Sequence, residues 1–204
     1  SFQHEDLSYS FFFFLVMPLG KVDAAHIFTT LTDHLMSCIL MKGKRANIYI
    51  DDLLSACQGY KLALLQDQFI QDFFAQGGWV FKASKSSGLP SQRVTYLGLI
   101  IDSVKMVFEI PPEKLERLLE GAKFLLSARR FLVKTLASWE GLLQSVRLAI
   151  GPIVSLMCRS LYDNIKSARF WSSYIQLSDL ARFQLKWWLD NLQDLYGFPI
   201  CKES

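Results

Sequence analysis

Hydrophobic and polar positions follow two different patterns along the chain, and the change between them comes near residue 111. Before that point, short apolar runs alternate with stretches in which apolar residues recur every three or four positions. Beyond it, only the helical recurrence remains. The sequence therefore predicts an α+β lobe over residues 1–111, followed by an all-helical lobe over residues 112–204.

Two helices and several strands are predicted in the first lobe. One helix runs from Ala24 to Met41, and the other from about Lys61 to Gln76, where Gly77-Gly78 provides a C-terminal stop. The predicted strands are rich in aromatic and β-branched residues. They are YSFFFFLVMP (9–18), RANIYI (45–50), LLSA (53–56), GWVF (78–81), VTYLGLII (94–101) and KMVFEI (105–110).

Four helices are predicted in the second lobe. Pro111-Pro112 opens the first, with Glu113 and Glu116 in its first turn, where the helix dipole favours acidic side chains. The others are predicted over residues 136–150 and 153–167, and from the N-cap Ser178 to near Gly197.

Composition and charge give little information about the class of protein or its partners. Apolar residues make up 51% of the 204 residues and charged residues 20%, as in a globular protein. Residues 1–111 hold 9 Lys or Arg against 10 Asp or Glu, whereas residues 112–204 hold 13 against 9. The mildly basic second lobe fits a surface near phosphates, although a solvated helical face is the commoner cause of such a bias.

Cysteine spacing and hydropathy indicate an intracellular protein, cytoplasmic or nuclear, without a membrane partner. The four cysteines form no CxxC pair and no zinc-like cluster with histidine, so we expect scattered core thiols in a reducing compartment. The longest apolar run, Phe11 to Leu19, is shorter than the roughly 20 residues that a bilayer requires. No positively charged segment precedes it, which argues against a signal peptide.

The adjacent Asp51 and Asp52 interrupt the apolar run ANIYIDDLLSA (46–56). Side chains of consecutive strand residues point to opposite faces, but the tip of a tight hairpin allows both carboxylates to reach one ligand. Paired carboxylates repel unless a cation neutralises them, and Mg²⁺ accepts such ligands together with water and substrate phosphates. The alternative is an ordinary hairpin whose turn contains two aspartates.

The neighbours of this pair resemble reverse transcriptases. Tyr49-Ile50-Asp51-Asp52 matches their Tyr-x-Asp-Asp signature, and MPLGKVDAAHIF (17–28) resembles the segment that shapes their nucleotide and template site. FKASKSSGLPSQRVTYLGLIID (81–102) resembles their lysine-serine pair, Pro-x-Gln and Tyr-Leu-Gly hairpin. IPPEKLERLLE (110–120) looks like the start of the thumb. LARFQLKWWLDNLQ (180–193) is similar to the segment before ribonuclease H in DIRS-type retroelements and related LTR retrotransposons.

The resemblance covers nearly the whole chain and implies a partial palm, an antiparallel sheet with packed helices, over residues 1–111. Residues 112–204 would form the thumb and the connection segment. The implied activity is RNA-directed DNA synthesis with an RNA template, a DNA primer and deoxynucleoside triphosphates. Asp51 and Asp52 would bind two Mg²⁺ or Mn²⁺ ions, which serve nucleotidyl transfer. Lys85 would give a proton to the departing pyrophosphate, with Lys82 as the rival for that role.

Further roles follow from the same resemblance. Tyr49 would lie under the primer terminus, Pro18 and Gly20 would line the nucleotide pocket, and Leu97 and Gly98 would form the primer grip.

Simpler interpretations remain open for several of these residues. Gly20 would then only end a strand, and Lys85 would be a solvated loop lysine. Leu97-Gly98 would be a β-bulge beside the core. Trp187 and Trp188 are expected as core-facing and boundary residues of a helix rather than as a platform for stacked bases.

The chain also departs from the family pattern. Reverse transcriptases use a third carboxylate on a strand upstream of the Pro-x-Gly segment, and Asp6, the only aspartate before Pro18, lacks that strand context. Lys21 stands where the family usually has an apolar residue, and Ala25 stands where it usually has a proline. We therefore expect weak or no polymerase activity from the chain alone. The alternative function is a domesticated or decayed module that binds nucleic acid or protein without catalysis.

A palm sheet without its upstream strands would expose an apolar edge. We expect a protein partner or self-association to cover this edge, with Phe11 to Phe14 as the first contact.

Overall fold

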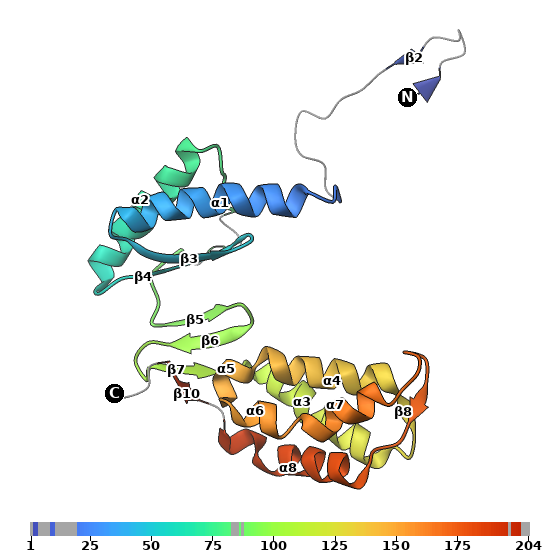
Figure 1. The fold of residues 1–204 in the computed structure, drawn as a ribbon. Coiled ribbons are helices and arrows are strands. Elements are labelled where there is room, and N and C mark those ends of the chain that lie inside the picture. The colour runs from blue at the N-terminus through green and yellow to red at the C-terminus, as the bar shows by residue number, and fades with distance from the viewer. Residues whose placement is uncertain are drawn as a thin grey trace. The chain divides into compact units, whose positions relative to one another are not determined.

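A computed structural model describes most of the chain, and the chain divides into two compact units. The residues described are 20–82, 86, 88–195 and 197–200, together with the backbone of 2–3 and 9–10. The units are Ser1–Pro90 and Ser91–Ser204, and each combines helices with antiparallel strands (Figure 1). The predicted α+β class is confirmed.

The first unit is built around one hairpin and two helices. Strand β3 (Arg45–Tyr49) pairs antiparallel with β4 (Asp52–Ala56). Helices α1 (Ala24–Met41) and α2 (Tyr60–Gln76) pack against this hairpin (Figure 1). Both helices were predicted to within one residue, because each has one clear apolar face.

A small core joins these elements. Its buried residues come from the two helices, and half-buried residues of the hairpin pack against them. The buried members are Met36, Ile39, Ile70 and Phe74. At the start of the unit, the short strands β1 (Phe2–Gln3) and β2 (Tyr9–Ser10) pair with each other.

The prediction of a strand over GWVF is wrong. Residues 78–82 form no strand; the Trp79 N–H instead donates to the Phe74 carbonyl at 3.0 Å, which closes the end of α2. Phe74 meets Trp79 and Phe81 edge to face, with ring centroids 6.2 and 5.5 Å apart. Packing on the core requires apolar side chains at these positions. The resulting apolar run has the same pattern as a buried strand, which explains the wrong prediction.

The second unit contains a four-stranded antiparallel sheet in the order β10–β7–β6–β5. The strands are β5 (Arg93–Tyr96), β6 (Leu99–Asp102), β7 (Val107–Glu109) and β10 (Phe198–Pro199). VTYLGLII was predicted as one strand, but it folds into β5 and β6 around a turn. The C-terminal strand β10 was not predicted, since two residues give too short a pattern to recognise.

Six helices follow the first three strands of this sheet. They are α3 (Pro112–Ser127), α4 (Val133–Ser145), α5 (Arg147–Ile150), α6 (Ile153–Leu156), α7 (Arg159–Lys166) and α8 (Asp179–Leu195). The predicted helix over 136–150 starts three residues earlier and breaks at Val146. The one over 153–167 breaks at Met157-Cys158. Strands β8 (Phe131–Leu132) and β9 (Tyr174–Ile175) pair between the helices, so this region is not all helical.

The core of the second unit lies between α3, α4, α7 and α8. Ser178 caps α8 as predicted, because its Oγ accepts the Ala181 N–H at 3.3 Å. Trp188 is fully buried and its Nε1 donates to the Met157 carbonyl at 2.9 Å. Half-buried Trp187 also packs against this core. The interpretation of Trp188 as a core residue is confirmed.

Other sequence expectations meet the structure in part. The expected lobe boundary at residue 111 lies inside the second unit, between β7 and α3, and stays a prediction about domain organisation. The Phe11 to Phe14 edge lies outside the described residues.

Cys158 is buried as expected for a core thiol, but Cys57 is exposed. Among the described helices, none is long and apolar enough to cross a membrane.

Candidate functional site

The aspartate pair lies at the turn of the β3–β4 hairpin. Tyr49 and Asp52 are the last paired residues, so Ile50 and Asp51 form a two-residue turn. Ile50 has φ of 55°, a conformation that a β-branched residue rarely adopts. Tight two-residue hairpin turns demand a positive φ at their first position, which explains where this strain arises. The hairpin tip expected for the two aspartates is therefore present.

Every residue of this tip is accessible to solvent. Tyr49 is 57% and Ile50 46% exposed, and both aspartates are exposed as well. The tip therefore presents an aromatic ring and two carboxylates together on one exposed turn.

A buried amide holds the opposite end of the hairpin. Gln66 of α2 is only 6% exposed, and its Nε2 donates to the carbonyls of Arg45 and Ala56, both at 3.1 Å. Arg45 and Ala56 are register partners, so one side chain ties both strands to α2. The sequence pattern did not indicate a role for Gln66. Its signal was a glutamine among the apolar residues on the buried face of α2.

The donor set at the tip suits a hard divalent cation. Among the described residues, no group of three His, Cys, Asp or Glu side chains is arranged to hold a metal. Mg²⁺ is nevertheless commonly held by one or two carboxylates, with water and substrate phosphates as its other ligands. Asp51 and Asp52 therefore fit Mg²⁺ as a partial ligand set that a nucleotide would complete.

The other predicted nucleotide-site residues are only partly described. Pro18 and Lys85 lie outside the described residues, and Lys82 is exposed. Gly20 has φ of 86°, and a Cβ there would meet no atom within 4 Å. Glycine is favoured at this position by backbone conformation, not by close packing.

Leu97 and Gly98 form the two-residue turn between β5 and β6 in the second unit. Their φ values of 49° and 72° are both positive, as in a type I′ hairpin turn. The alternative of a β-bulge is therefore wrong. Glycine is favoured at position 98 by its positive φ, because a Cβ there would meet only the flexible end of the Lys114 side chain. Leu97 is 44% exposed at the tip.

A charged cluster stabilises the next turn of the same sheet. Asp102 accepts the N–H groups of Val104 and Lys105 at 3.0 and 2.9 Å, and this bonding lowers the pKa of the Asp102 carboxyl. Glu109 accepts from Arg93 and, at 2.9 Å, from Lys105. These side chains neutralise one another, so they explain the β6–β7 turn rather than forming a ligand site.

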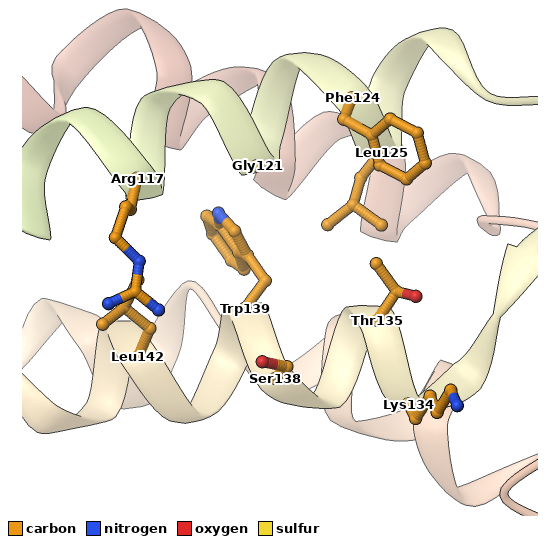
Figure 2. Close-up of a pocket in the computed structure, with 9 residues that line it drawn as sticks. All are labelled: Arg117, Gly121, Phe124, Leu125, Lys134, Thr135, Ser138, Trp139 and Leu142. Atoms are coloured by element: carbon orange, nitrogen blue, oxygen red, sulfur yellow. The ribbon is translucent and has the colours of Figure 1, made fainter.

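An open groove of about 430 Å³ lies between α3 and α4 (Figure 2). Arg117 and Lys134 approach it from different helices, and the Trp139 ring lies against Gly121 between them. The Nε1 of Trp139 donates to the Leu118 carbonyl at 2.8 Å, which fixes the ring. The sequence analysis did not find this groove. It offers positive charge beside exposed Phe124, a combination suited to an anionic ligand with apolar parts.

Comparison with solved structures identifies the fold. A structure of the foamy viral protease-reverse transcriptase dRH in complex with ds DNA matches 89% of this chain with a TM-score of 0.67. The chain has a reverse-transcriptase-like fold. The identity is 20%, so this likeness concerns the fold alone.

Two further structures have the same reverse-transcriptase-like fold. The foamy viral protease-reverse transcriptase with RNA/DNA hybrid has a TM-score of 0.65 at 22% identity, over 89% of this chain. The same protein with dsDNA has a TM-score of 0.65 at 20% identity, over 92% of this chain. This chain spans only 22% to 36% of the length of the three. No family model matches the chain, and no curated protein matches its sequence.

Proposed function

We propose that the chain forms the palm and thumb part of an RNA-directed DNA polymerase, a reverse transcriptase of a DIRS-type retroelement or a related LTR retrotransposon. The observation that carries this proposal is the Asp51-Asp52 pair on a strained two-residue turn, within a reverse-transcriptase-like fold. The retained Tyr-x-Asp-Asp sequence supports it.

In this proposal Asp51 and Asp52 hold two Mg²⁺ or Mn²⁺ ions. Such ions, when bound, activate the attacking hydroxyl and neutralise charge on the leaving phosphate. The chain itself supplies the two ligands on one hairpin, whose backbone is held by the β3–β4 register and by Gln66. The exposed ring of Tyr49 gives the primer terminus an apolar surface. Lys85, or its rival Lys82, would protonate the departing pyrophosphate.

The second unit would hold the primer and template. Leu97 and Gly98 would contact the primer strand as its grip. The basic groove between α3 and α4 offers Arg117 and Lys134 to phosphates. The foamy viral proteins with the same fold were solved with dsDNA or an RNA/DNA hybrid, which supports RNA template and DNA primer as partners. Deoxynucleoside triphosphates complete the proposed reaction.

The test combines metal binding with primer extension. Binding of Mn²⁺ in the presence of a deoxynucleoside triphosphate, followed by electron paramagnetic resonance, should weaken at least tenfold in Asp51→Asn and Asp52→Asn. It should be unchanged in Asp33→Asn, which alters an exposed aspartate on α1. Extension of a DNA primer on an RNA template should be weak or absent, since the sequence shows two of the three carboxylates that the family uses.

Three outcomes separate the candidate functions. Equal Mn²⁺ binding by wild type and both hairpin variants would refute the metal site. Salt-dependent binding of an RNA–DNA duplex without metal binding would favour the non-catalytic module. Efficient extension that Asp51→Asn abolishes would support the polymerase and refute the expectation of weak activity.

A further inference from the structure

A rigid turn at the β8–β9 end of the second unit carries exposed aromatic residues. The Ser173 N–H donates to the Phe170 carbonyl at 2.9 Å, and the Phe170 N–H donates to the Ser173 Oγ at 3.2 Å. The Ser173 carbonyl in turn accepts the Val133 N–H at 3.0 Å. These bonds close the turn and attach its backbone to the start of α4.

The aromatic side chains of this turn point to solvent. Phe170 is 62%, Trp171 66% and Tyr174 60% exposed. A single exposed apolar residue is ordinary, but three large aromatic rings within five residues form a patch that needs a reason.

Positive charge surrounds this aromatic turn. Strands β8 and β9, which pair with Leu132 opposite Tyr174, lie within the segments 127–135 and 166–178. These two segments contain five basic residues and no Asp or Glu. The basic residues are Arg129, Arg130, Lys134, Lys166 and Arg169. All five are exposed, and none forms an ion pair with another residue in the described part of the chain.

Some of these cations already lie against aromatic rings. The Arg169 guanidinium is 5.3 Å from the centroid of Phe170, and the Lys166 Nζ is 4.6 Å from that of Tyr162. At the turn itself, a cation therefore lies beside an exposed ring of the candidate surface. This surface, which we call the β8–β9 surface, consists of the aromatic turn 170–174 and the five basic residues.

We propose that the β8–β9 surface binds single-stranded nucleic acid. Unpaired bases would stack on the rings of Trp171, Phe170 and Tyr174, while the basic side chains contact the phosphates. A duplex fits this surface poorly, because its base faces are covered by neighbouring bases. The surface does not involve Asp51 or Asp52 and shares only Lys134 with the α3–α4 groove, so the proposal adds a single-strand site to the polymerase role and is tested apart from its metal site.

The experiment measures binding of a dye-labelled poly-uridine or poly-thymidine oligomer to the full chain by fluorescence anisotropy, without metal ions. Trp171→Ala should weaken binding about tenfold, because it removes one stacking ring. Trp171→Phe should retain most of the affinity. Phe183→Ala removes a comparably exposed ring on α8, 61% exposed, and should leave binding unchanged.

Salt dependence tests the basic part of the surface. The double variant Arg129→Gln, Arg130→Gln should lower the slope of log affinity against log salt by about 1.4, because each phosphate contact to a single strand contributes about 0.7. Arg159→Gln changes an exposed arginine of α7 outside the surface and serves as the charge control. Circular dichroism would verify that each variant is folded.

Other occupants would give different results. Wild-type affinity in Trp171→Ala would overturn the proposal. So would binding to phosphatidylserine vesicles in place of oligonucleotide, or a dimer in sedimentation that Trp171→Ala dissolves. Asp51→Asn should bind the oligomer normally, so loss of the polymerase proposal and loss of this one can be told apart.

Discussion

Single residues of this chain show how local conformation and burial adjust chemistry. Ile50 accepts a strained φ of 55° so that both aspartates sit at the hairpin tip. Cys158 shows the effect of burial, because desolvation and the nearby Glu140 charge raise the pKa of its thiol to about 12. Cys57 is exposed, so the two thiols differ in environment.

This difference predicts selective alkylation. At pH 8 in the folded chain, iodoacetamide should modify Cys57 and leave Cys158 unmodified, because the thiolate is the reactive form. Peptide mass spectrometry measures both sites, and unfolding in urea should make them equally reactive. Equal labelling of both thiols in the folded chain would contradict the prediction.

The same thiol predicts a dependence of stability on pH. The unfolded Cys158 ionises near its ordinary pKa of 9.0 and the folded one does not, so Cys158 should reduce stability as pH rises above about 9.

At the scale of elements, side-chain hydrogen bonds from helix α2 hold the β3–β4 hairpin of the candidate site in place. Replacing Gln66 with Leu leaves the Arg45 and Ala56 carbonyls without their donor. We expect the free energy of unfolding to fall by about 1–3 kcal/mol, because two hydrogen bonds worth about 0.5–1.5 kcal/mol each are lost. Urea denaturation measures this loss, and faster amide hydrogen exchange in β3 and β4 would locate it.

Gln68, two residues after Gln66 on α2, provides a matched control. Its amide donates to Asp72 at 2.8 Å on the exposed side of the helix. Gln68→Leu should change stability by less than about 0.5 kcal/mol, as is usual for surface substitutions. Similar losses in the two variants would show that Gln66 acts through general helix stability instead of the hairpin.

Two helical glycines give opposite predictions for the α3–α4 pair. A Cβ on Gly121 would come within 2.5 Å of the Trp139 ring, whereas one on Gly141 would meet nothing within 4 Å. Gly141→Ala should therefore stabilise the chain by about 0.5–1 kcal/mol through helix propensity. Gly121→Ala should destabilise it by about 1–3 kcal/mol, because the Trp139 ring must shift from its fixed position. Thermal unfolding compares the two, and stabilisation by both would mean that the ring moves without cost.

Periodicity predicted long amphipathic elements and missed features that depend on packing between elements. It located α1, α2, α3 and α8, each with a continuous apolar face. It could not find the breaks at Val146 and Met157, since apolar residues continue in helical register through both. The aspartate turn was expected from local residues. Gln66 and the α3–α4 groove were not, because their partners lie ten or more residues away in the sequence.

At the scale of the whole molecule, the two units differ greatly in the size of their cores. The second unit has nineteen buried core residues, and the first has four among the residues described. Stability follows buried apolar area, so we expect the units to unfold separately, with the first unit melting earlier. The structural division at Pro90 and the sequence boundary at residue 111 then make different predictions for fragments.

A fragment of residues 91–204 keeps the whole sheet of the second unit, whereas one of residues 112–204 loses β5, β6 and β7. In the shorter fragment Phe198 loses its partner Phe108, and the core loses Leu99 and Ile110. We therefore expect 91–204 to unfold cooperatively in urea, and 112–204 to be less stable by at least about 3 kcal/mol, since two buried side chains and the β7–β10 pairing are lost. Circular dichroism at 222 nm would follow both transitions. Equal stability of the two fragments would support the boundary at residue 111, because the strands β5 to β7 would then contribute nothing to the fold of the helices.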